Sequence, residues 1–158
     1  MQQALQFEVR HVRAVDRKGG VVLFVRDYMT RGVISVSPKT EILKTLHLMH
    51  EHDISNAPVV DTNGRLVGML SDRDCIRGVI QGVYHSEFAG QVGDFMAGDV
   101  ETIGPDEGLI DVTRRLVDLP HRLYPVVAGG DIVGVISRRD IIAALTEKWQ
   151  WSGRGGRS

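Results

Sequence analysis

The stretch GRLVGMLSDRD, residues 64–74, returns 66 residues later as GDIVGVISRRD, residues 130–140. Six of the eleven positions are identical. In both copies an apolar run that favours a β-strand leads directly into the pattern Ser-x-x-Asp, once at Ser71 and Asp74 and once at Ser137 and Asp140. Internal repetition of this kind predicts that a whole structural unit occurs twice.

The repeat extends well beyond that stretch. VRDYMT at residues 25–30 matches VGDFMA at 92–97, and PVV recurs at Pro58 and Pro125, at an offset of 67. The offset drops to 66 across a turn, where a deletion is tolerated best. The predicted organisation is an N-terminal extension at 1–24 (a hairpin or a segment without fixed structure), a first repeat at 25–80, a connector at 81–91, a second repeat at 92–145 and a Gly/Arg-rich tail at 146–158.

Each repeat is predicted to contain strand, helix, strand, strand and helix. In the first copy we expect a strand at 33–36, a helix capped by Ser37 with Pro38 in its first turn, a hairpin around an Asn-Gly turn, and a second helix opened by Ser71. In the second copy Gly104 and Pro105 are expected to start the first helix, and Pro120 to end it. A unit of about 55 residues buries little core alone. The expected fold is therefore α+β, with two β-α-β-β-α repeats packed as an intramolecular pseudo-two-fold pair.

Composition narrows the function classes. The 158 residues carry a formal net charge of -1, which argues against nucleic acid or an anionic membrane surface as a partner. No apolar run approaches the roughly 20 residues of a membrane span, and the first residues lack a secretory pattern. Cys75 is the single cysteine, so no intrachain disulfide can form, which favours the cytoplasm.

The repeated Ser-x-x-Asp has two interpretations. As local structure it is close to a capping box, with an acid at the positive end of a helix. As a site, a helix N-terminus offers free amides, Arg73 and Arg139 can meet a phosphate, and a carboxylate can accept hydrogen bonds from the two hydroxyls of a ribose. A flat base between apolar strand residues would complete a nucleotide. The residues alone leave both interpretations open.

Taken together, VRDYMT…VSP and HDISNAPVVD…GRLVGMLSDRD in the first copy, with VGDFMA…IGP and HRLYPVV…DIVGVISRRD in the second, resemble the CBS (cystathionine-β-synthase) domain family, specifically a stand-alone tandem pair. The resemblance covers about 120 residues. It implies two interlocked units that often dimerise into a flat disk. It also implies clefts between the units that bind AMP, ADP, ATP, NAD or S-adenosylmethionine, and a role as a regulatory sensor.

By the same resemblance, Asp74 and Asp140 contact the ribose, and Ser71 and Ser137 lie near the phosphate. The base pocket is implied at 34–37 and 55–58 in the first copy and at 102–104 and 122–125 in the second, each cleft mixing both copies. The candidate nucleotide-binding residues are Ile34, Ser37, Ser55, Asn56, Ala57, Pro58, Ser71, Arg73, Asp74, Thr102, Ile103, Arg122, Tyr124, Pro125, Ser137, Arg138, Arg139 and Asp140.

The two copies differ. Tyr124 stands in RLYP where the first copy has SNAP, and it either stacks on an adenine or fills the pocket. Arg138 and Arg139 replace Asp72 and Arg73, so we expect the Asp140 cleft to favour phosphorylated ligands more than the Asp74 cleft does.

Other chemistry finds little support. His47 and His50 have a spacing that can hold a metal, but a solvated helix flank is the better interpretation, and Cys75 is expected to be a packed small residue. No Walker or Rossmann loop and no base–nucleophile pair is present. We therefore predict a non-catalytic regulatory module that requires no cofactor or metal. Its preferred ligand is predicted to be AMP, followed by ATP or NAD. We also expect it to form a homodimer and to act on an unidentified protein. The alternative is a structural or interaction protein in which Ser-x-x-Asp only caps helices; an enzyme acting on a bound nucleotide ranks last.

Overall fold

The structure is a computed structural model that describes residues 14–15, 21–85 and 90–153. Predictions for residues 1–13, 16–20, 86–89 and 154–158 lie outside this description. The helices and strands follow one another as β1 (Ala14–Val15), β2 (Val21–Val22), α1 (Val25–Tyr28), α2 (Ile42–Glu51), β3 (Asn56–Val60), β4 (Leu66–Ser71), α3 (Asp72–His85), α4 (Val92–Phe95), α5 (Leu109–Leu116), β5 (Leu123–Ala128), β6 (Asp131–Ser137) and α6 (Arg138–Gly153). This order confirms an α+β chain with two related halves.

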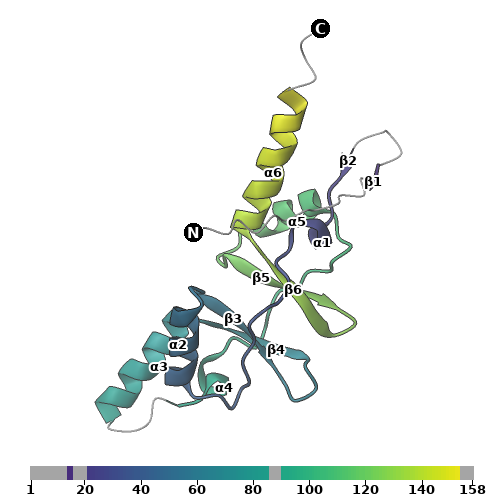
Figure 1. Ribbon diagram of the computed structural model, residues 1–158. Coiled ribbons are helices and arrows are strands. Elements are labelled where there is room, and N and C mark those ends of the chain that lie inside the picture. Colours follow the sequence, from purple (N-terminus) through teal and green to yellow (C-terminus); the bar gives the residue numbers. More distant parts are fainter. Residues whose placement is uncertain (1–13, 16–20, 86–89, 154–158) are drawn as a thin grey trace, which may run out of the picture.

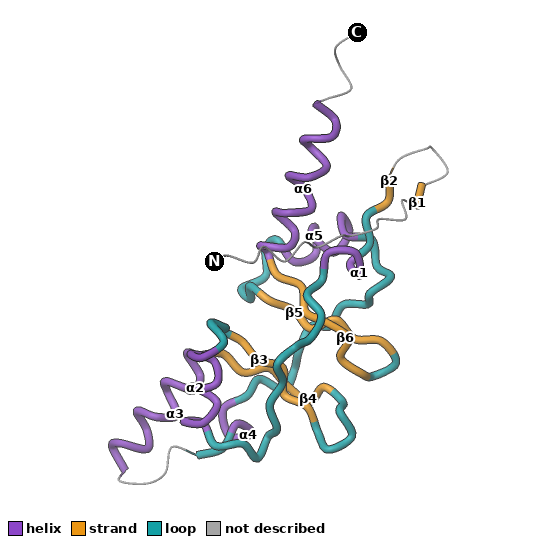
Figure 2. The backbone as a smooth tube through the Cα atoms, in the orientation of Figure 1, coloured by secondary structure: helices purple, strands orange, loops and turns teal. Residues whose placement is uncertain are grey.

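Two hairpins form the centre of the molecule (Figure 1). Strand β3 pairs antiparallel with β4, and β5 pairs with β6. The predicted Asn-Gly turn closes the first hairpin, where Gly64 has a φ of 78° and the Asp61 carboxylate accepts hydrogen bonds from the amides of Asn63 and Arg65. Helices α3 and α6 start directly after β4 and β6, so both Ser-x-x-Asp segments lie where a strand ends and a helix begins (Figure 2).

The predicted helix starts at Ser37 and at Gly104–Pro105 are wrong. Residues 37–40 form a turn in which the Thr40 amide donates to the Ser37 carbonyl, and α2 begins only at Ile42. The second copy repeats this, with a turn after Gly104 and a helix from Leu109 that ends at Leu116, before Pro120. The reason is that proline in the second position of a four-residue turn suits a β-turn as well as it suits a helix start.

The predicted first strand is also shorter than expected. In place of a strand at 33–36, the structure has a single parallel bridge between Val36 and Val59. The second copy has the equivalent bridge between Ile103 and Val126. Each bridge adds the start of a repeat to the hairpin of the same repeat.

The short first helix of each repeat packs on the other repeat. Val25 and Met29, on and just after α1, are buried in one core with Leu109 and Val126 of the second half. Conversely, Val92 of α4 is buried with Ile42 in the first half. Figure 1 shows α1 beside α5 and α4 close to the first hairpin. The two halves are therefore interlocked, as a CBS-type pair requires.

Backbone hydrogen bonds fix this exchange. The Thr30 amide donates to the Val135 carbonyl at 2.8 Å, and the Val135 amide donates to the Thr30 carbonyl at 3.0 Å. Met69 and Ala97 form the equivalent pair at 3.0 and 2.9 Å. Each crossing segment thus extends the hairpin of the opposite half by one bridge.

Candidate functional site

The Ser-x-x-Asp segments form nearly identical caps at α3 and α6. The amides of Ser71 and Ser137 donate to the Oδ2 atoms of Asp74 and Asp140 at 3.0 and 2.7 Å. In return, the Asp74 and Asp140 amides donate to the serine hydroxyl oxygens at 3.1 and 3.3 Å. Each serine hydroxyl also donates to the same Oδ2, at 2.7 and 2.8 Å. The capping interpretation of these residues is therefore correct as local structure.

These caps use only one oxygen of each carboxylate. Oδ1 of Asp74 lies 3.7 Å from Nη1 of Arg77, and the Asp74 side chain is 25% exposed. Oδ1 of Asp140 has no hydrogen-bond or ion-pair partner among the described residues. A half-buried carboxylate that is held in place through one oxygen can accept a hydrogen bond from a ligand hydroxyl through the other.

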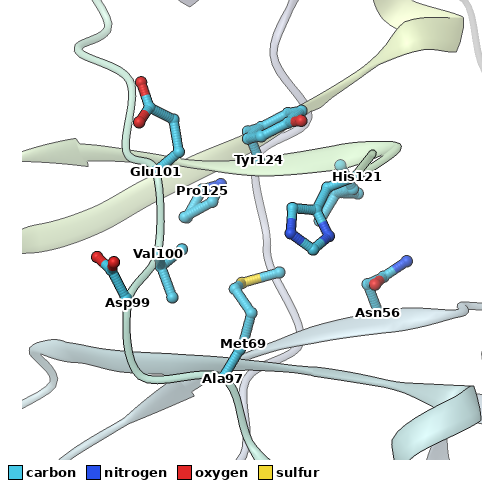
Figure 3. Close-up of a pocket in the computed structure, with 10 residues that line it drawn as sticks. Asn56, Met69, Ala97, Asp99, Val100, Glu101, His121, Tyr124 and Pro125 are labelled. Atoms are coloured by element: carbon cyan, nitrogen blue, oxygen red, sulfur yellow. The ribbon is translucent and has the colours of Figure 1, made fainter. Parts of the chain in front are cut away.

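A pocket lies between the two halves (Figure 3). Its lining comes from both copies: Asn56, Met69, Ala97, Asp99, Val100, Glu101, His121, Leu123, Tyr124 and Pro125. The void measures about 40 Å³. Asn56 pairs in register with Ser71, and Met69 precedes Ser71 by two residues on β4. Leu123, which pairs in register with Ser137, lines the pocket too, so the pocket lies at the ends of both hairpins, and neither Asp74 nor Asp140 is part of its wall. Met69 places it over the strand that leads to Asp74, although most of its wall is contributed by the second copy.

Four residues of the predicted base-pocket ranges line this pocket: Asn56, Leu123, Tyr124 and Pro125. Ala57, Pro58 and Ile103 are buried in the structure, and Ala57 and Ile103 belong to the two cores. The backbones of Ser55 and Arg122 accept hydrogen bonds from the amides of Asp72 and Arg138, at the starts of α3 and α6. Ile34, Ser37, Ser55, Thr102 and Arg122 are not among the residues that line the pocket.

The arginines predicted to face a phosphate differ in their contacts. The guanidinium of Arg138 donates to the Leu119 carbonyl at 2.9 Å, just after α5. Arg73 and Arg139 are exposed. Arg138 therefore ties α6 to the end of α5 in this structure, and Arg139 is the freer cation beside Asp140.

Tyr124 is the unusual member of the pocket wall. Its side chain is 3% exposed and packs in the second core, and its ring meets the His121 ring edge-on at 6.2 Å between centroids. Burial raises the pKa of the phenol, opposed in part by the nearby His121 backbone and the Arg138 charge. That backbone contact does not have the geometry of a hydrogen bond, so within the described part of the chain the buried hydroxyl is without a partner.

The sequence profile of the CBS domain matches residues 25–81 and 92–147. The chain belongs to the CBS domain family. The CBS domain-containing protein YhcV of Bacillus subtilis is 31% identical over 118 residues, which cover 74% of this chain and 81% of YhcV. The crystal structure of CBSX2, a CBS-pair protein of Arabidopsis thaliana, in complex with AMP superimposes with a TM-score of 0.70 at 31% identity, covering 79% of this chain and 98% of CBSX2.

Other relatives of this CBS pair are longer. MJ1225 of Methanocaldococcus jannaschii is 29% identical over 128 residues, which cover 81% of this chain but only 45% of MJ1225. The chain thus spans less than half the length of that relative.

The CBS pair as described offers two further observations. None of its described helices combines the length and apolarity needed to cross a bilayer. In the same residues, no three side chains of His, Cys, Asp or Glu come together as metal ligands. His47 instead forms an exposed pair with Glu51, at 3.2 Å between Nε2 and Oε1.

Six pocket residues lie outside the predicted base-pocket ranges: Met69, Ala97, Asp99, Val100, Glu101 and His121. Met69 carries a usable signal, because it lies on the same strand face as Ser71, two residues away. Ala97 enters the pocket through the crossing of the second repeat over β4, which no local pattern in the sequence reveals.

Proposed function

We propose that the protein is a regulatory module that binds an adenosyl nucleotide and transmits this binding to a protein partner. The observation that supports it most is the second oxygen of each capping carboxylate, because the caps use Oδ2 alone. Among the described residues Oδ1 of Asp140 has no partner, and Oδ1 of Asp74 meets only the exposed Arg77 at 3.7 Å. A ribose presents two neighbouring hydroxyl donors, and a fixed carboxylate is their natural acceptor. Free amides at the same helix end suit the negative charge of a phosphate.

The choice of ligand rests on the relatives. CBSX2 has been crystallised with AMP, and its pair of CBS domains matches most of this chain. AMP is therefore our first candidate, followed by ATP or NAD, with ADP and S-adenosylmethionine also to be tested. No resident cofactor is proposed.

The interlocked architecture supports a mechanism of signalling. The two halves are joined by the bridges Thr30–Val135 and Met69–Ala97, and the pocket lies beside the second of these. A ligand held between the halves contacts both and stabilises one packing arrangement over another. The equilibrium shifts only as far as the ligand's affinities for the two arrangements differ.

A homodimer is part of the proposal. Helices α2 and α3 expose large apolar side chains, as do α5 and α6: Leu43, Ile76, Ile80, Val83 and Tyr84 on the first pair, and Ile110, Val117, Ile142 and Leu145 on the second. Apolar faces of this kind mark interaction surfaces. Light scattering after size exclusion should report twice the chain mass, and Val83→Asp should lower it, whereas Lys44→Asp on the exposed face of α2 should not.

No catalytic step is proposed, because the carboxylates of Asp74 and Asp140 are held in helix caps and can only accept hydrogen bonds from a ligand. Incubated AMP should be recovered unchanged by mass spectrometry, and turnover would contradict this part. The single cysteine favours the cytoplasm as the location.

The alternative function, a structural protein whose Ser-x-x-Asp segments only cap helices, is favoured by the completeness of the caps themselves. Thermal denaturation with AMP, ADP, ATP, NAD and S-adenosylmethionine separates the two. At about 100 times its dissociation constant a ligand adds roughly 2.7 kcal/mol of stability. The regulatory module is supported if at least one of these compounds raises the melting temperature and ribose 5-phosphate, which lacks adenine, does not. The structural alternative is supported if none of these compounds changes the melting temperature.

A further inference from the structure

The two halves of the protein differ most at one buried position in equivalent strands. Tyr124 on β5 and Ala57 on β3 each precede the proline of a PVV segment and lie 67 residues apart in the repeat. Tyr124 is 3% exposed and Ala57 is completely buried. A phenol ring in one half therefore occupies the place of a methyl group in the other.

The pocket beside Tyr124 is small. Pockets that hold a small-molecule ligand usually measure about 300–1,000 Å³, whereas this void measures about 40 Å³. The ring of Tyr124 lies above Met69 of the opposite half, and His121 stands between them and Asn56 (Figure 3). A void of this size beside a buried hydroxyl without a partner suits a water molecule better than a nucleoside.

Charge distinguishes the halves in the same way. The carboxylates of Asp99 and Glu101 lie on the pocket wall. Arg115 pairs with Glu101 at 3.3 Å but also with Glu107 at 3.0 Å, and Asp99 has no ion pair among the described residues. The repeat places Gly32 and Ile34 at the equivalent positions of the other half, and neither carries a charge. An acidic wall opposes a phosphorylated ligand, while its counterpart does not.

We infer that Tyr124 prevents an adenosyl nucleotide from entering the Asp74 side, so that each chain binds one such ligand, on the Asp140 side, where the small Ala57 stands at the position equivalent to Tyr124. This inference rests on the proposed function and adds that one residue, Tyr124, decides which of the two sides binds the nucleotide. On the Asp140 side the equivalent of Tyr124 is a methyl group and the equivalents of Asp99 and Glu101 are uncharged. Among the described residues Oδ1 of Asp140 has no partner, whereas Oδ1 of Asp74 meets Arg77. Tyr124 is thus a specificity-determining residue for the pair of sites.

Calorimetric titration with AMP tests the inference. The wild-type chain should bind one AMP. Asp140→Ala should weaken binding at least about tenfold, as expected when a hydrogen bond to a charged group is lost. Asp74→Ala removes the same kind of cap on the side that Tyr124 closes, so it discriminates between one occupied side and two; the inference expects its affinity to stay within about threefold of the wild type.

A second pair of variants tests Tyr124 itself. Tyr124→Leu should admit a second AMP, so that the double variant Tyr124→Leu/Asp140→Ala again binds one, whereas Tyr124→Phe keeps the ring and should still bind one. Two AMP molecules per wild-type chain, or loss of binding in Asp74→Ala alone, would overturn the inference even if the leucine variants do not fold. Absence of binding of AMP, ADP, ATP, NAD and S-adenosylmethionine in every variant would overturn the proposed function together with it, which distinguishes the two failures.

Discussion

Gly68 lies directly beneath Ala97, and a Cβ added at Gly68 would stand 2.8 Å from the Ala97 carbonyl oxygen and 2.8 Å from Sδ of Met96. The repeat contains the same relationship between Gly134 and the segment Met29–Thr30, again at 2.8 Å. We therefore expect Gly68→Ala and Gly134→Ala each to lower the free energy of unfolding by about 1–3 kcal/mol, because backbone atoms cannot yield as a side chain can. Urea denaturation measures this.

Gly98 provides the matched control, since no described atom lies within 4 Å of a Cβ at that position. Gly98→Ala should change stability by no more than about 0.5 kcal/mol. Equal stability of Gly68→Ala and Gly98→Ala would mean that the crossing segment does not pass over β4.

The serine caps should contribute to stability independently of any ligand. Ser71→Ala and Ser137→Ala each remove the acceptor of an aspartate amide at the start of a helix, at a cost of about 0.5–2 kcal/mol. Ser35→Ala, at an exposed loop position, should cost less than about 0.5 kcal/mol. If the cap variants were as stable as the control, the hydrogen bonds at Asp74 and Asp140 would not form in solution.

Tyr124→Phe should leave stability unchanged or raise it by up to about 1 kcal/mol, because a buried hydroxyl without a partner costs free energy and its removal leaves no void. The exposed residue Tyr84 is the control, and Tyr84→Phe should be neutral. A clear loss of stability in Tyr124→Phe would reveal a hydrogen bond to the hydroxyl.

The phenol of Tyr124 also makes the stability of the folded protein depend on pH. Its pKa is raised in the folded protein by burial, so the folded state binds the proton more tightly than the unfolded state. This contribution to stability is complete below the ordinary tyrosine pKa of about 10 and is lost as pH rises through the folded-state value. The wild type should therefore lose more stability above that pH than Tyr124→Phe, and equal slopes would contradict the burial of the phenol.

Cys75 should react slowly in the folded protein. Burial first, then the charges of Asp74 and Asp72, raise the pKa of its thiol from 9.0 to about 11. Since the thiolate is the reactive form, alkylation by iodoacetamide near pH 8 should be roughly 100-fold slower in the native protein than in urea. The associated stability is complete below about pH 9 and falls toward pH 11. Equal alkylation rates in both states would show that the thiol is accessible.

Local patterns in the sequence predicted the hairpins and the caps well. Asn63–Gly64 and Ser71–Asp74 are contiguous signals, and the structure forms a turn and a helix start where they predict them. The starts of α2 and α5 were predicted wrongly because Pro38 and Pro105 suit a turn and a helix equally well. The repeat itself is visible in the short stretch GRLVGMLSDRD and along each whole unit, and it was enough to predict the paired architecture.

The composition of the pocket could not be predicted in the same way. Met69 and Ala97 come together only because each repeat sends its first segment to the other half. Equivalent residues of the two repeats have the same local sequence pattern, whichever residues of the other half they contact. The sequence therefore does not show which residues of the two repeats line one pocket together. The pocket therefore groups His121 and Tyr124 of the second repeat with Asn56 and Met69 of the first.

The claim on which the account depends is that an aspartate at the start of a final helix holds a ribose. A crystal structure of the protein grown with AMP tests it most directly. The account predicts a ribose hydroxyl oxygen within about 2.6–3.2 Å of Oδ1 of Asp140 or Asp74, with the cap through Oδ2 retained. AMP bound away from both carboxylates, or no AMP at all while both caps are intact, would contradict it.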